Sequence, residues 1–186
     1  TRSDASLQPS SLNRKMKSEH HLPIASLPIH TPDGTFLAQY SEKGLMRLDF
    51  PTRKNPVAAW AEIPGVRAQI SLWHKLTTRT LKEALLARPI SELPPFDLGD
   101  ATKFQRKVWV ALQEIPIGET KTYGEVAREI RNPKATRAVG SGCGANPIPV
   151  LIPCHRMIAA CGKIGGFSGG LKWKELLLKR EGVLFI

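Results

Sequence analysis

The stretch from Asn146 to Arg156 constrains the fold of this chain most, because it contains three prolines in a short space. Proline fixes φ and has no backbone N–H, so the stretch makes a poor central strand and is predicted to be a stiff, extended rod. The rod ends in Cys154 and His155, followed by the guanidinium of Arg156. Cationic neighbours lower the pKa of a thiol, and the thiolate is the nucleophile. Cys154 is therefore either an activated nucleophile or a buried structural cysteine.

The cysteine content indicates a reducing compartment. Three cysteines, at positions 143, 154 and 161, are too few and too clustered for a disulfide framework. No Cys-x-x-Cys spacing is present, so we expect neither a metal site nor a cofactor. No apolar run reaches membrane-spanning length and no secretory signal opens the chain. We therefore expect a soluble protein without a membrane partner, cytoplasmic or, in a eukaryote, nuclear.

The charge of the chain is unevenly distributed. The net charge is +11, and residues 101–186 carry 14 Lys and Arg against 6 Asp and Glu, whereas residues 1–100 carry 13 against 10. A basic excess in one half points to a polyanion partner, most often nucleic acid. Basic charge is also a common solubility device, so alone it favours DNA only modestly.

The first hundred residues read as a tail, a small domain and a linker. Residues 1–21 lack periodicity and are predicted to be a flexible tail. Residues 22–88 are predicted to form an α/β domain, with a hairpin turning at Pro32-Asp33-Gly34 and a helical stripe over 69–87. Residues 89–100 are rich in proline and acidic side chains and are predicted to be the linker.

Residues 101–186 are predicted to form a mainly helical domain. An amphipathic helix spans Phe104 to Ile115. Thr122 and Glu125 have the spacing of a capping box, which opens a second helix. Asn132-Pro133 is predicted to begin a third, as cap and first-turn proline. The second and third of these helices are predicted to form a helix-turn-helix.

Small residues gather on one side of that third helix. Ala135, Ala138 and Val139 are predicted to face the core, and the opposite side presents the residues Arg137, Gly140, Ser141 and Gly144. Glycine in a helix costs about 1 kcal/mol relative to alanine, so several together need a reason. Close helix packing explains them as well as close approach to DNA does. The arginine projecting beyond the smooth face favours DNA.

The final helix is predicted to span Lys172 to Glu181, with Gly182 after it. Glu181 is either a surface residue or the group that orients His155. Because neighbours in an extended segment point to opposite sides, His155 is expected to reach Cys154 through a water. Asn146 is expected to brace the turn at the other end of the rod. The glycine-rich loop over 162–170 lacks the spacing of a nucleotide site.

Several motifs together resemble those of the O6-alkylguanine-DNA alkyltransferases, also called methylated-DNA–protein-cysteine methyltransferases. Arg137-Ala138-Val139-Gly140, Asn146-Pro147 and Ile152-Pro153-Cys154-His155-Arg156 carry the signature. Similar flanking motifs are Ile115-Pro116-x-Gly118-Glu119-Thr120-x-x-Tyr123, Ser168-Gly169-Gly170 and Lys174-x-x-Leu177-Leu178-x-x-Glu181-Gly182. The resemblance is continuous and specific over 101–186, and general over 22–100.

The resemblance implies a two-domain α+β fold. A small N-terminal α/β domain of ribonuclease H-like topology would precede a mainly helical domain with a winged-helix-like helix-turn-helix. The implied function is DNA repair by direct damage reversal, in which Cys154 takes the alkyl group from the O6 atom of guanine in a single, irreversible turnover. His155 would act as the base through water, Glu181 would orient it, and Asn146 would support the turn.

The resemblance also implies how damaged double-stranded DNA is held. Tyr123 would assist flipping of the nucleotide and donate a hydrogen bond to the guanine, and Arg137 would fill the gap left in the duplex. Ser168 would touch the O6 region, and the backbone around Cys154 and Met157 would read the exocyclic amine. Flipping suits the chemistry, because a thiolate cannot reach O6 inside a stacked duplex. A monomer is expected, and the sequence leaves open whether it binds DNA cooperatively.

The chain departs from the family pattern at several positions. Phe167 stands where many members have tyrosine, and Arg131 occupies a usual glycine position. Gly142-Cys143 replaces a more usual alanine-led pair, and Met157 replaces a common valine. Two other functions remain open: a helix-turn-helix damage sensor or transcription regulator with an inert Cys154, and a Cys-His hydrolase. The family's non-enzymatic relatives carry tryptophan at the cysteine position, and no oxyanion-hole motif supports a hydrolase.

Overall fold

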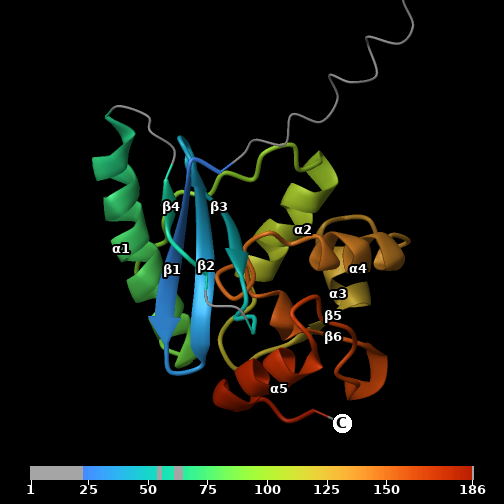
Figure 1. Cartoon of the computed structure of the whole chain (residues 1–186). Coiled ribbons are helices and arrows are strands. Elements are labelled where there is room, and N and C mark those ends of the chain that lie inside the picture. Colours follow the sequence, from blue (N-terminus) through green and yellow to red (C-terminus); the bar gives the residue numbers. More distant parts are fainter. Residues whose placement is uncertain (1–22, 54–55, 61–64, 186) are drawn as a thin grey trace, which may run out of the picture.

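A small antiparallel sheet and a set of short helices pack side by side in this computed structural model (Figure 1). The structure describes residues 23–53, 56–60 and 65–185; the predicted tail over 1–21 lies outside the described residues. The strands are β1 Ala25–Thr31, β2 Gly34–Ser41, β3 Gly44–Asp49, β4 Ala59–Trp60, β5 Lys121–Thr122 and β6 Met157–Ile158. The helices are α1 Val66–Leu85, α2 Lys103–Gln113, α3 Tyr123–Glu129, α4 Thr136–Gly144 and α5 Leu171–Arg180, with 3-10 turns η1 Cys154–Arg156 and η2 Ala160–Gly162.

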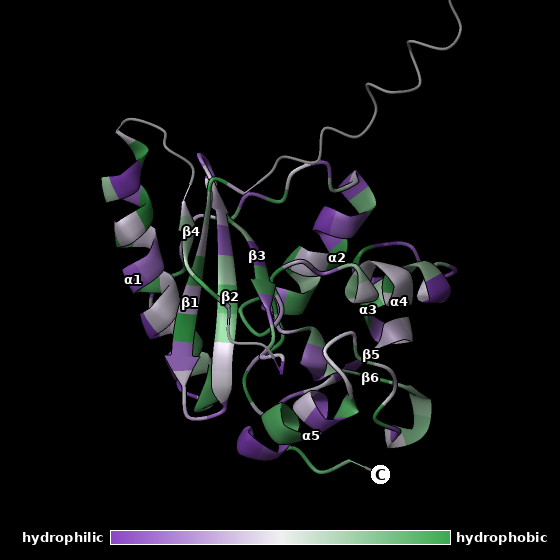
Figure 2. Ribbon diagram, in the orientation of Figure 1, coloured by the Kyte–Doolittle hydropathy of each residue, from purple (hydrophilic) through white to green (hydrophobic). Residues whose placement is uncertain are grey.

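The N-terminal sheet has the order β3-β2-β1-β4, and its strands are antiparallel. The predicted hairpin is confirmed, because β1 and β2 join at Pro32-Asp33 and Thr31 pairs with Gly34. Alternate residues of β2, from Phe36 through Ala38 to Tyr40, are fully buried, as expected for strands with one face in a core. The long helix α1 covers one face of the sheet (Figure 1). Figure 2 shows many hydrophilic residues on the face of α1 that points away from the sheet.

The proline-rich segment predicted to be a linker is packed along the edge of the sheet. The amide of Leu45 donates to the carbonyl of Pro95 at 2.8 Å, and the amide of Asp97 donates to the carbonyl of Leu45 at 2.9 Å. Ser41 Oγ donates to Asp97 Oδ2 at 2.5 Å. Because β3 is an edge strand with free backbone groups, an extended proline-rich chain can satisfy some of them.

The second half is built from short, well-capped helices. Thr122 and Glu125 form the predicted capping box at the start of α3. The prediction that Asn132-Pro133 begins the next helix was wrong. Helix α4 begins at Thr136, and residues 132–135 form a turn in which the amide of Ala135 donates to the carbonyl of Asn132 at 2.9 Å. Arg131 ends α3 in the left-handed region, at φ 58°. A non-glycine residue there costs about 1–2 kcal/mol, whereas glycine adopts this conformation without strain.

The core face of α4 also differs from the prediction. Ala138 is exposed, whereas Val139, Gly142 and Cys143 are buried. The carbonyl of Gly142 accepts a hydrogen bond of 2.9 Å from Trp109 Nε1 on α2. An added Cβ on Gly142 would lie 3.4 Å from Val108, so a glycine lets α4 press closely onto α2. Gly142 therefore serves helix packing, although it was not part of the predicted small-residue face. An added Cβ on Gly140 would meet only Tyr123, at 3.8 Å, and one on Gly144 would meet nothing within 4 Å.

Aromatic side chains join the two halves of the molecule. Phe50, just after β3, packs against Phe167 at 5.7 Å and Trp173 at 4.9 Å between ring centroids. Arg180, at the end of α5, makes a double ion pair with Asp33 in the hairpin turn, with its Nη1 2.7 Å from Oδ2. Across the described residues, no helix is long and apolar enough to span a bilayer.

Candidate active site

The proline-rich stretch folds as a tight turn, and the predicted extended rod was wrong. Val150 sits at the tip with φ 73°, and the amide of Ile152 donates back to the carbonyl of Ile148 at 2.9 Å. A fixed proline φ suits a turn as well as a rod, and the local hydrogen bonds decide for the turn. Figure 1 shows this segment in the middle of the molecule, between α4 and α5.

Asn146 braces this turn with every polar atom of its side chain. Its Oδ1 accepts from the amide of Ile148 at 3.0 Å, and its Nδ2 donates to the carbonyl of Ile152 at 2.8 Å. The same Nδ2 lies 3.0 Å from Sγ of Cys154. Because these contacts are buried, removing the amide would leave several polar groups unpaired. Asn146 therefore links the shape of the turn to the position of the thiol.

Cys154 begins the 3-10 turn η1, so Cys154 and His155 are not neighbours in an extended segment as predicted. Directly after η1, β6 pairs in parallel with β5, through Lys121 with Met157 and Thr122 with Ile158. This short pairing brings the first residue of α3, Tyr123, towards the cysteine. Cys154 is buried, with 2% of its surface exposed.

His155 is held by the carboxylate at the end of α5. Its Nε2 lies 3.0 Å from Oε1 of Glu181, and the Glu181 side chain is 3% exposed. Of the two alternatives for Glu181, the contact with His155 is therefore present, and the surface position is not. Burial lowers the pKa of His155, although the carboxylate opposes that effect. A neutral imidazole with its N–H on Nε2 donates to Glu181 and keeps Nδ1 as an acceptor. Nδ1 is buried and has no hydrogen-bond partner among the described residues.

Arg156 has a structural role that the sequence did not reveal. Its guanidinium donates to Glu181 through Nε and through Nη2, the latter at 2.9 Å, and its Nη1 donates to the carbonyl of Ile115 at 2.6 Å. Burial alone raises the pKa of Glu181, but the hydrogen bonds from His155 and Arg156 outweigh it and lower that pKa to about 2. Arg156 thus keeps the carboxylate charged beside a neutral histidine.

The pKa of Cys154 is lowered, as predicted, but from a different source. A hydrogen bond with Cys143 is the largest cause, followed by burial, which raises the pKa, and by the bond from Asn146, which lowers it. The predicted influence of His155 and Arg156 is absent from these causes, because the histidine is neutral and the guanidinium is engaged by Glu181. Lys174 is the cation that acts on the thiol.

Lys174 was missed as a site residue because it lies within a helix of ordinary amphipathic pattern. It is fully buried, and its Nζ donates to the carbonyl of Met157 and, at 3.4 Å, to the carbonyl of Gly166. Burial lowers the pKa of Lys174. A lysine enclosed this fully among carbonyls is a recognisable signal only once the fold is known.

A small pocket of about 250 Å³ opens beside the nucleophile. Its lining residues come from α3, α4 and the glycine-rich loop: Tyr123, Gly140, Cys143, Gly144, Gly166, Phe167 and Ser168. Four of them, Tyr123, Gly140, Gly144 and Ser168, are predicted site residues. Burial raises the pKa of Tyr123, so its phenol stays protonated and can donate at neutral pH. Sγ of Cys143 reaches the carbonyl of Cys154 at 3.7 Å, which connects the pocket wall to the nucleophile.

The other predicted site residues lie outside this pocket. Met157 is fully buried, and its carbonyl accepts from Lys174. Arg137 and Ser141 are exposed on α4, and the Ser141 hydroxyl donates to the carbonyl of Arg137 at 3.2 Å. They therefore lie on an open helix surface near the pocket mouth.

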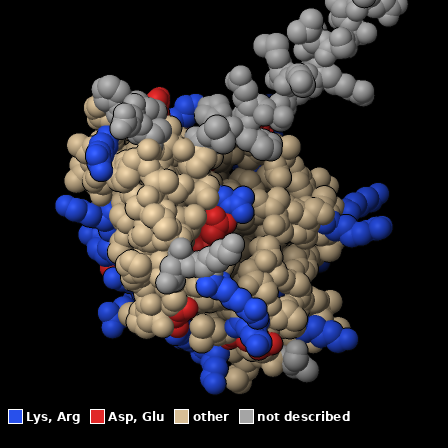
Figure 3. Space-filling model, viewed as in Figure 1, with Lys and Arg blue, Asp and Glu red and all other residues tan. Residues whose placement is uncertain are grey.

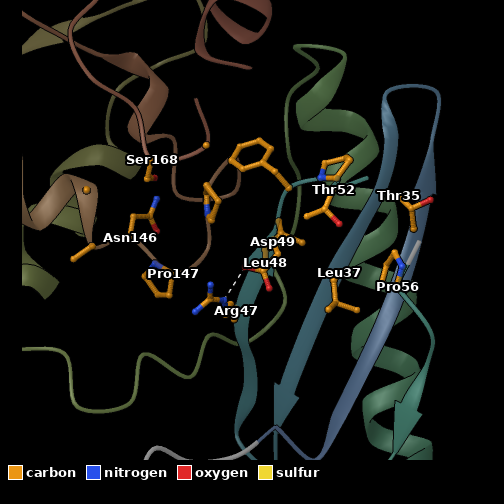
Figure 4. A pocket seen from close by; sticks show the side chains of 16 residues that line it. Thr35, Leu37, Arg47, Leu48, Asp49, Thr52, Pro56, Asn146, Pro147 and Ser168 are labelled. Atoms are coloured by element: carbon orange, nitrogen blue, oxygen red, sulfur yellow. Dashed lines mark hydrogen bonds and ion pairs between the residues drawn. The ribbon is translucent and has the colours of Figure 1, made fainter. Parts of the chain in front are cut away.

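A larger cavity of about 690 Å³ lies between the sheet and the second half of the chain. Figure 4 shows Asn146, Pro147 and Ser168 on one side of it and Thr35 and Leu37 on the other. Gly144 and Ser168 line both cavities, so the two are neighbours. In the face shown in Figure 3, basic side chains project at several places around the outline of the molecule, and acidic side chains are fewer. Among the residues that the structure describes, no group of three His, Cys, Asp or Glu is placed to hold a metal.

Comparison with known proteins identifies the family. Residues 103–183 match the family described as 6-O-methylguanine DNA methyltransferase, DNA binding domain. A methylated-DNA–protein-cysteine methyltransferase of Methanosarcina acetivorans is 43% identical over 155 residues, covering 82% of this chain and 94% of that protein. The crystal structure of Mycobacterium tuberculosis OGT in complex with DNA aligns with a TM-score of 0.67 at 34% identity, covering 83% of this chain and 90% of that one.

A second solved structure supports the same assignment. An O6-methylguanine DNA methyltransferase from Methanococcus jannaschii aligns with a TM-score of 0.60 at 26% identity, covering 86% of this chain and 95% of that one. The similarity therefore extends over both halves, including the N-terminal sheet, for which the sequence motifs were only general. This chain belongs to the methylated-DNA–protein-cysteine methyltransferase family.

Proposed function

We propose that this protein repairs O6-alkylated guanine in double-stranded DNA by transferring the alkyl group to Cys154, once per molecule. One observation carries the proposal: the thiol of Cys154 lies beside a pocket lined by Tyr123 and Ser168. Cys143 forms part of the pocket wall and contacts the carbonyl of Cys154, and Asn146 Nδ2 lies 3.0 Å from Sγ of Cys154. Family membership supplies the reaction, and the cysteine at position 154 supplies the acceptor. A damage sensor with an inert Cys154 would not need a lowered thiol pKa.

The thiolate forms by loss of a proton towards His155. Nε2 of His155 is engaged by Glu181, so Nδ1 is the nitrogen that can accept. A water that bridges Nδ1 and the thiol relays the proton, in keeping with general-base geometry. Glu181 holds the ring in the required tautomer, and Arg156 in turn holds Glu181.

The alkyl group then moves in one displacement. Sγ of Cys154 bonds to the alkyl carbon while the bond from that carbon to guanine O6 breaks, and the electron pair of the broken bond passes to the guanine. The guanine anion takes up one proton from water, and protonated His155 returns to water the proton that it received, so that the step is neutral overall. The phenol of Tyr123 donates a hydrogen bond to the leaving guanine, and Ser168 contacts the O6 region. The thioether product holds no proton or leaving group that would regenerate the thiolate, so each molecule acts once.

The backbone around Cys154 and Met157 reads the exocyclic amine of guanine. The carbonyl of Met157 already accepts from Lys174, but a carbonyl oxygen has two lone pairs and can accept a second donor. Lys174 thereby fixes the direction of a group that contacts the base. This arrangement favours guanine, whose amine is a donor in the minor groove.

The exposed surface of α4 binds the duplex. We infer that Gly140, Ser141 and Gly144 allow close approach of the backbone to the minor groove, while Arg137 enters the space left by the flipped nucleotide. Contacts to phosphates carry no sequence information, which suits damage that can lie anywhere. The net charge of +11 favours this partner.

We also propose a finer description of the two halves of the fold, based on the resemblance to the family. The sheet with α1 on one face corresponds to the family's ribonuclease H-like N-terminal domain, and α3 with α4 corresponds to a winged-helix-like helix-turn-helix. The boundary lies in residues 89–100. The protein works as a monomer in the compartment that holds the genome, which is the cytoplasm, or the nucleus in a eukaryote.

Mass spectrometry tests the proposal directly. After incubation with duplex DNA containing O6-methylguanine, we expect the tryptic peptide 138–156 to gain one methyl group. That peptide contains both Cys143 and Cys154, so fragment ions must place the methyl on Cys154. Cys154→Ala is expected to bind the duplex without transfer, and Cys161→Ser, which removes an exposed thiol, is expected to react fully. Binding without any adduct on the native chain would favour the sensor instead.

A further inference from the structure

A second thiol lies against the nucleophile. Cys143, near the end of α4, donates from Sγ to the carbonyl of Cys154 at 3.7 Å. Both side chains are buried, at 7% and 2% exposure, and both cysteines are free. Asn146 follows Cys143 by three residues and donates to Sγ of Cys154 at 3.0 Å. The end of α4 therefore directs two donors at one residue.

We propose that Cys143 is a positioning residue whose S–H donates a hydrogen bond to Cys154 and holds its sulfur as the thiolate. This inference rests on the proposed role of Cys154 as the acceptor. The hydrogen of a thiol rotates about the Cβ–Sγ bond, so it can point to the Cys154 carbonyl while Cys154 is a thiol. It turns to the sulfur when that sulfur becomes an anion, since a charged acceptor makes the stronger bond.

The proton inventory of the step is simple. The proton that leaves Cys154 passes to the bridging water and then to His155, and Cys143 keeps its own proton throughout. After alkyl transfer the sulfur is a neutral thioether, which is a weak acceptor. The Cys143 S–H then returns to the carbonyl. Cys143 forms no covalent bond in this sequence and does not become an acceptor of the alkyl group.

Apart from Nδ1 of His155, which has no partner among the described residues, the charged and polar groups near the thiol are engaged elsewhere. His155 Nε2 is bound to Glu181, and Nζ of Lys174 donates to the carbonyls of Met157 and Gly166. Arg156 is engaged by Glu181 and the carbonyl of Ile115, and Tyr123 faces the pair from α3 as a protonated phenol. The side chains in the described part of the chain that donate hydrogen bonds to Cys154 are therefore those of Cys143, to its carbonyl, and Asn146, to its sulfur, while the amide of Met157 also donates to its carbonyl.

The electrostatics of the pair agree with this geometry. The contact with Cys143 is the largest cause that lowers the pKa of Cys154, against the opposing effect of burial. The same contact, with burial, raises the pKa of Cys143. The two thiols therefore divide the roles, with Cys154 as the anion and Cys143 as the donor.

A titration of the thiolate tests the inference without DNA. Thiolate absorbs in the ultraviolet more strongly than thiol, so each protein is measured against its own Cys154→Ala counterpart over a pH series. Cys143→Ala removes the donor and is expected to move the Cys154 midpoint up by about one pH unit, which is about tenfold less thiolate below the midpoint. Cys143→Ser keeps a donor and is expected to restore part of the shift, and Cys161→Ser is the matched control.

The outcomes separate a hydrogen-bond role from a packing role. An unchanged or lower midpoint in Cys143→Ala would overturn the inference, whatever happens to the melting temperature. If Cys143→Ala does not fold, Cys143→Val fills the same space without a donor and must show the same rise in midpoint. The titration midpoint does not depend on repair activity. A missing methyl adduct would therefore contradict the proposed function without deciding whether Cys143 stabilises the thiolate.

Discussion

Replacing Glu181 with glutamine should reveal how much this buried carboxylate contributes to the site. The side chain is 3% exposed and accepts from Nε2 of His155 and from Nε and Nη2 of Arg156. Glutamine has nearly the same shape, but it offers one acceptor oxygen and places an NH₂ group against these donors. The guanidinium of Arg156, whose side chain is largely buried, would then lack its counter-charge.

The magnitude follows from the pKa. The hydrogen bonds from His155 and Arg156 hold the pKa of Glu181 at about 2, against an ordinary value of 4.5. At 1.36 kcal/mol for each pH unit this corresponds to about 3 kcal/mol, and partial screening at Arg156 reduces it to about 2–3 kcal/mol. We therefore expect Glu181→Gln to lower the melting temperature by about 5–10 °C.

The loss should depend on pH in one direction only. Because the pKa of Glu181 is lower in the folded than in the unfolded chain, its contribution is fully present above about pH 4.5. It is lost as the pH falls towards 2. The difference in unfolding free energy between the native chain and Glu181→Gln should thus be largest at pH 7 and shrink steadily in acid, while other carboxylates cancel in the comparison.

Urea unfolding at a series of pH values measures this difference. Glu175→Gln is the matched control, since Glu175 is exposed on the same helix and should change the unfolding free energy by less than about 0.5 kcal/mol. Equal effects of the two substitutions at pH 7 would refute the reasoning, as would a gap for Glu181→Gln that stays constant into acid. The rate of methyl transfer should also fall in Glu181→Gln, because His155 loses its orientation.

Three further substitutions test other parts of the structure. Lys174→Met should leave two carbonyls without their donor and slow methyl transfer at least tenfold. Lys172→Met, on the exposed side of α5, is the control and should leave the rate unchanged. Equal rates in the two variants would show that the buried ammonium is dispensable. Arg137→Ala should slow repair of duplex more than reaction with free O6-methylguanine, with Lys82→Ala as control, and equal losses would contradict gap filling. Arg131→Gly should raise the unfolding free energy by about 1 kcal/mol in a urea titration, since φ is 58°, and a decrease would contradict the assigned strain.

The local elements were predictable because their signals are local. The hairpin at Pro32-Asp33-Gly34 and the capping box of Thr122 with Glu125 each depend on a few adjacent residues, and both are present. The start of α4 was misplaced because Asn132-Pro133 offers good cap chemistry, yet the chain uses it for a turn instead. Local propensity gives way there to the packing of α4 on α2.

The sequence indicated one contact of the candidate site and missed others. Contact between Glu181 and His155 could be expected from spacing and helix position, but the bonds of Arg156 to Glu181 and Ile115 join segments far apart in the sequence. The same holds for Lys174, whose burial depends on how α5 meets β6. Long-range partners of this kind leave no periodic trace in one sequence. The proline-rich turn was misjudged because proline restricts φ without choosing between an extended and a turned chain.

Gly169 and Phe50 give the two halves of the molecule a shared geometric limit. A Cβ built on Gly169 would lie 2.3 Å from the Phe50 ring, so the loop that carries Ser168 rests directly on an aromatic side chain from the other half. Any enlargement of Phe50 would push that loop towards the pocket, and any reduction would give it room to withdraw. We therefore expect the range of adduct sizes that fit beside Cys154 to depend partly on Phe50, a residue in the other half of the chain.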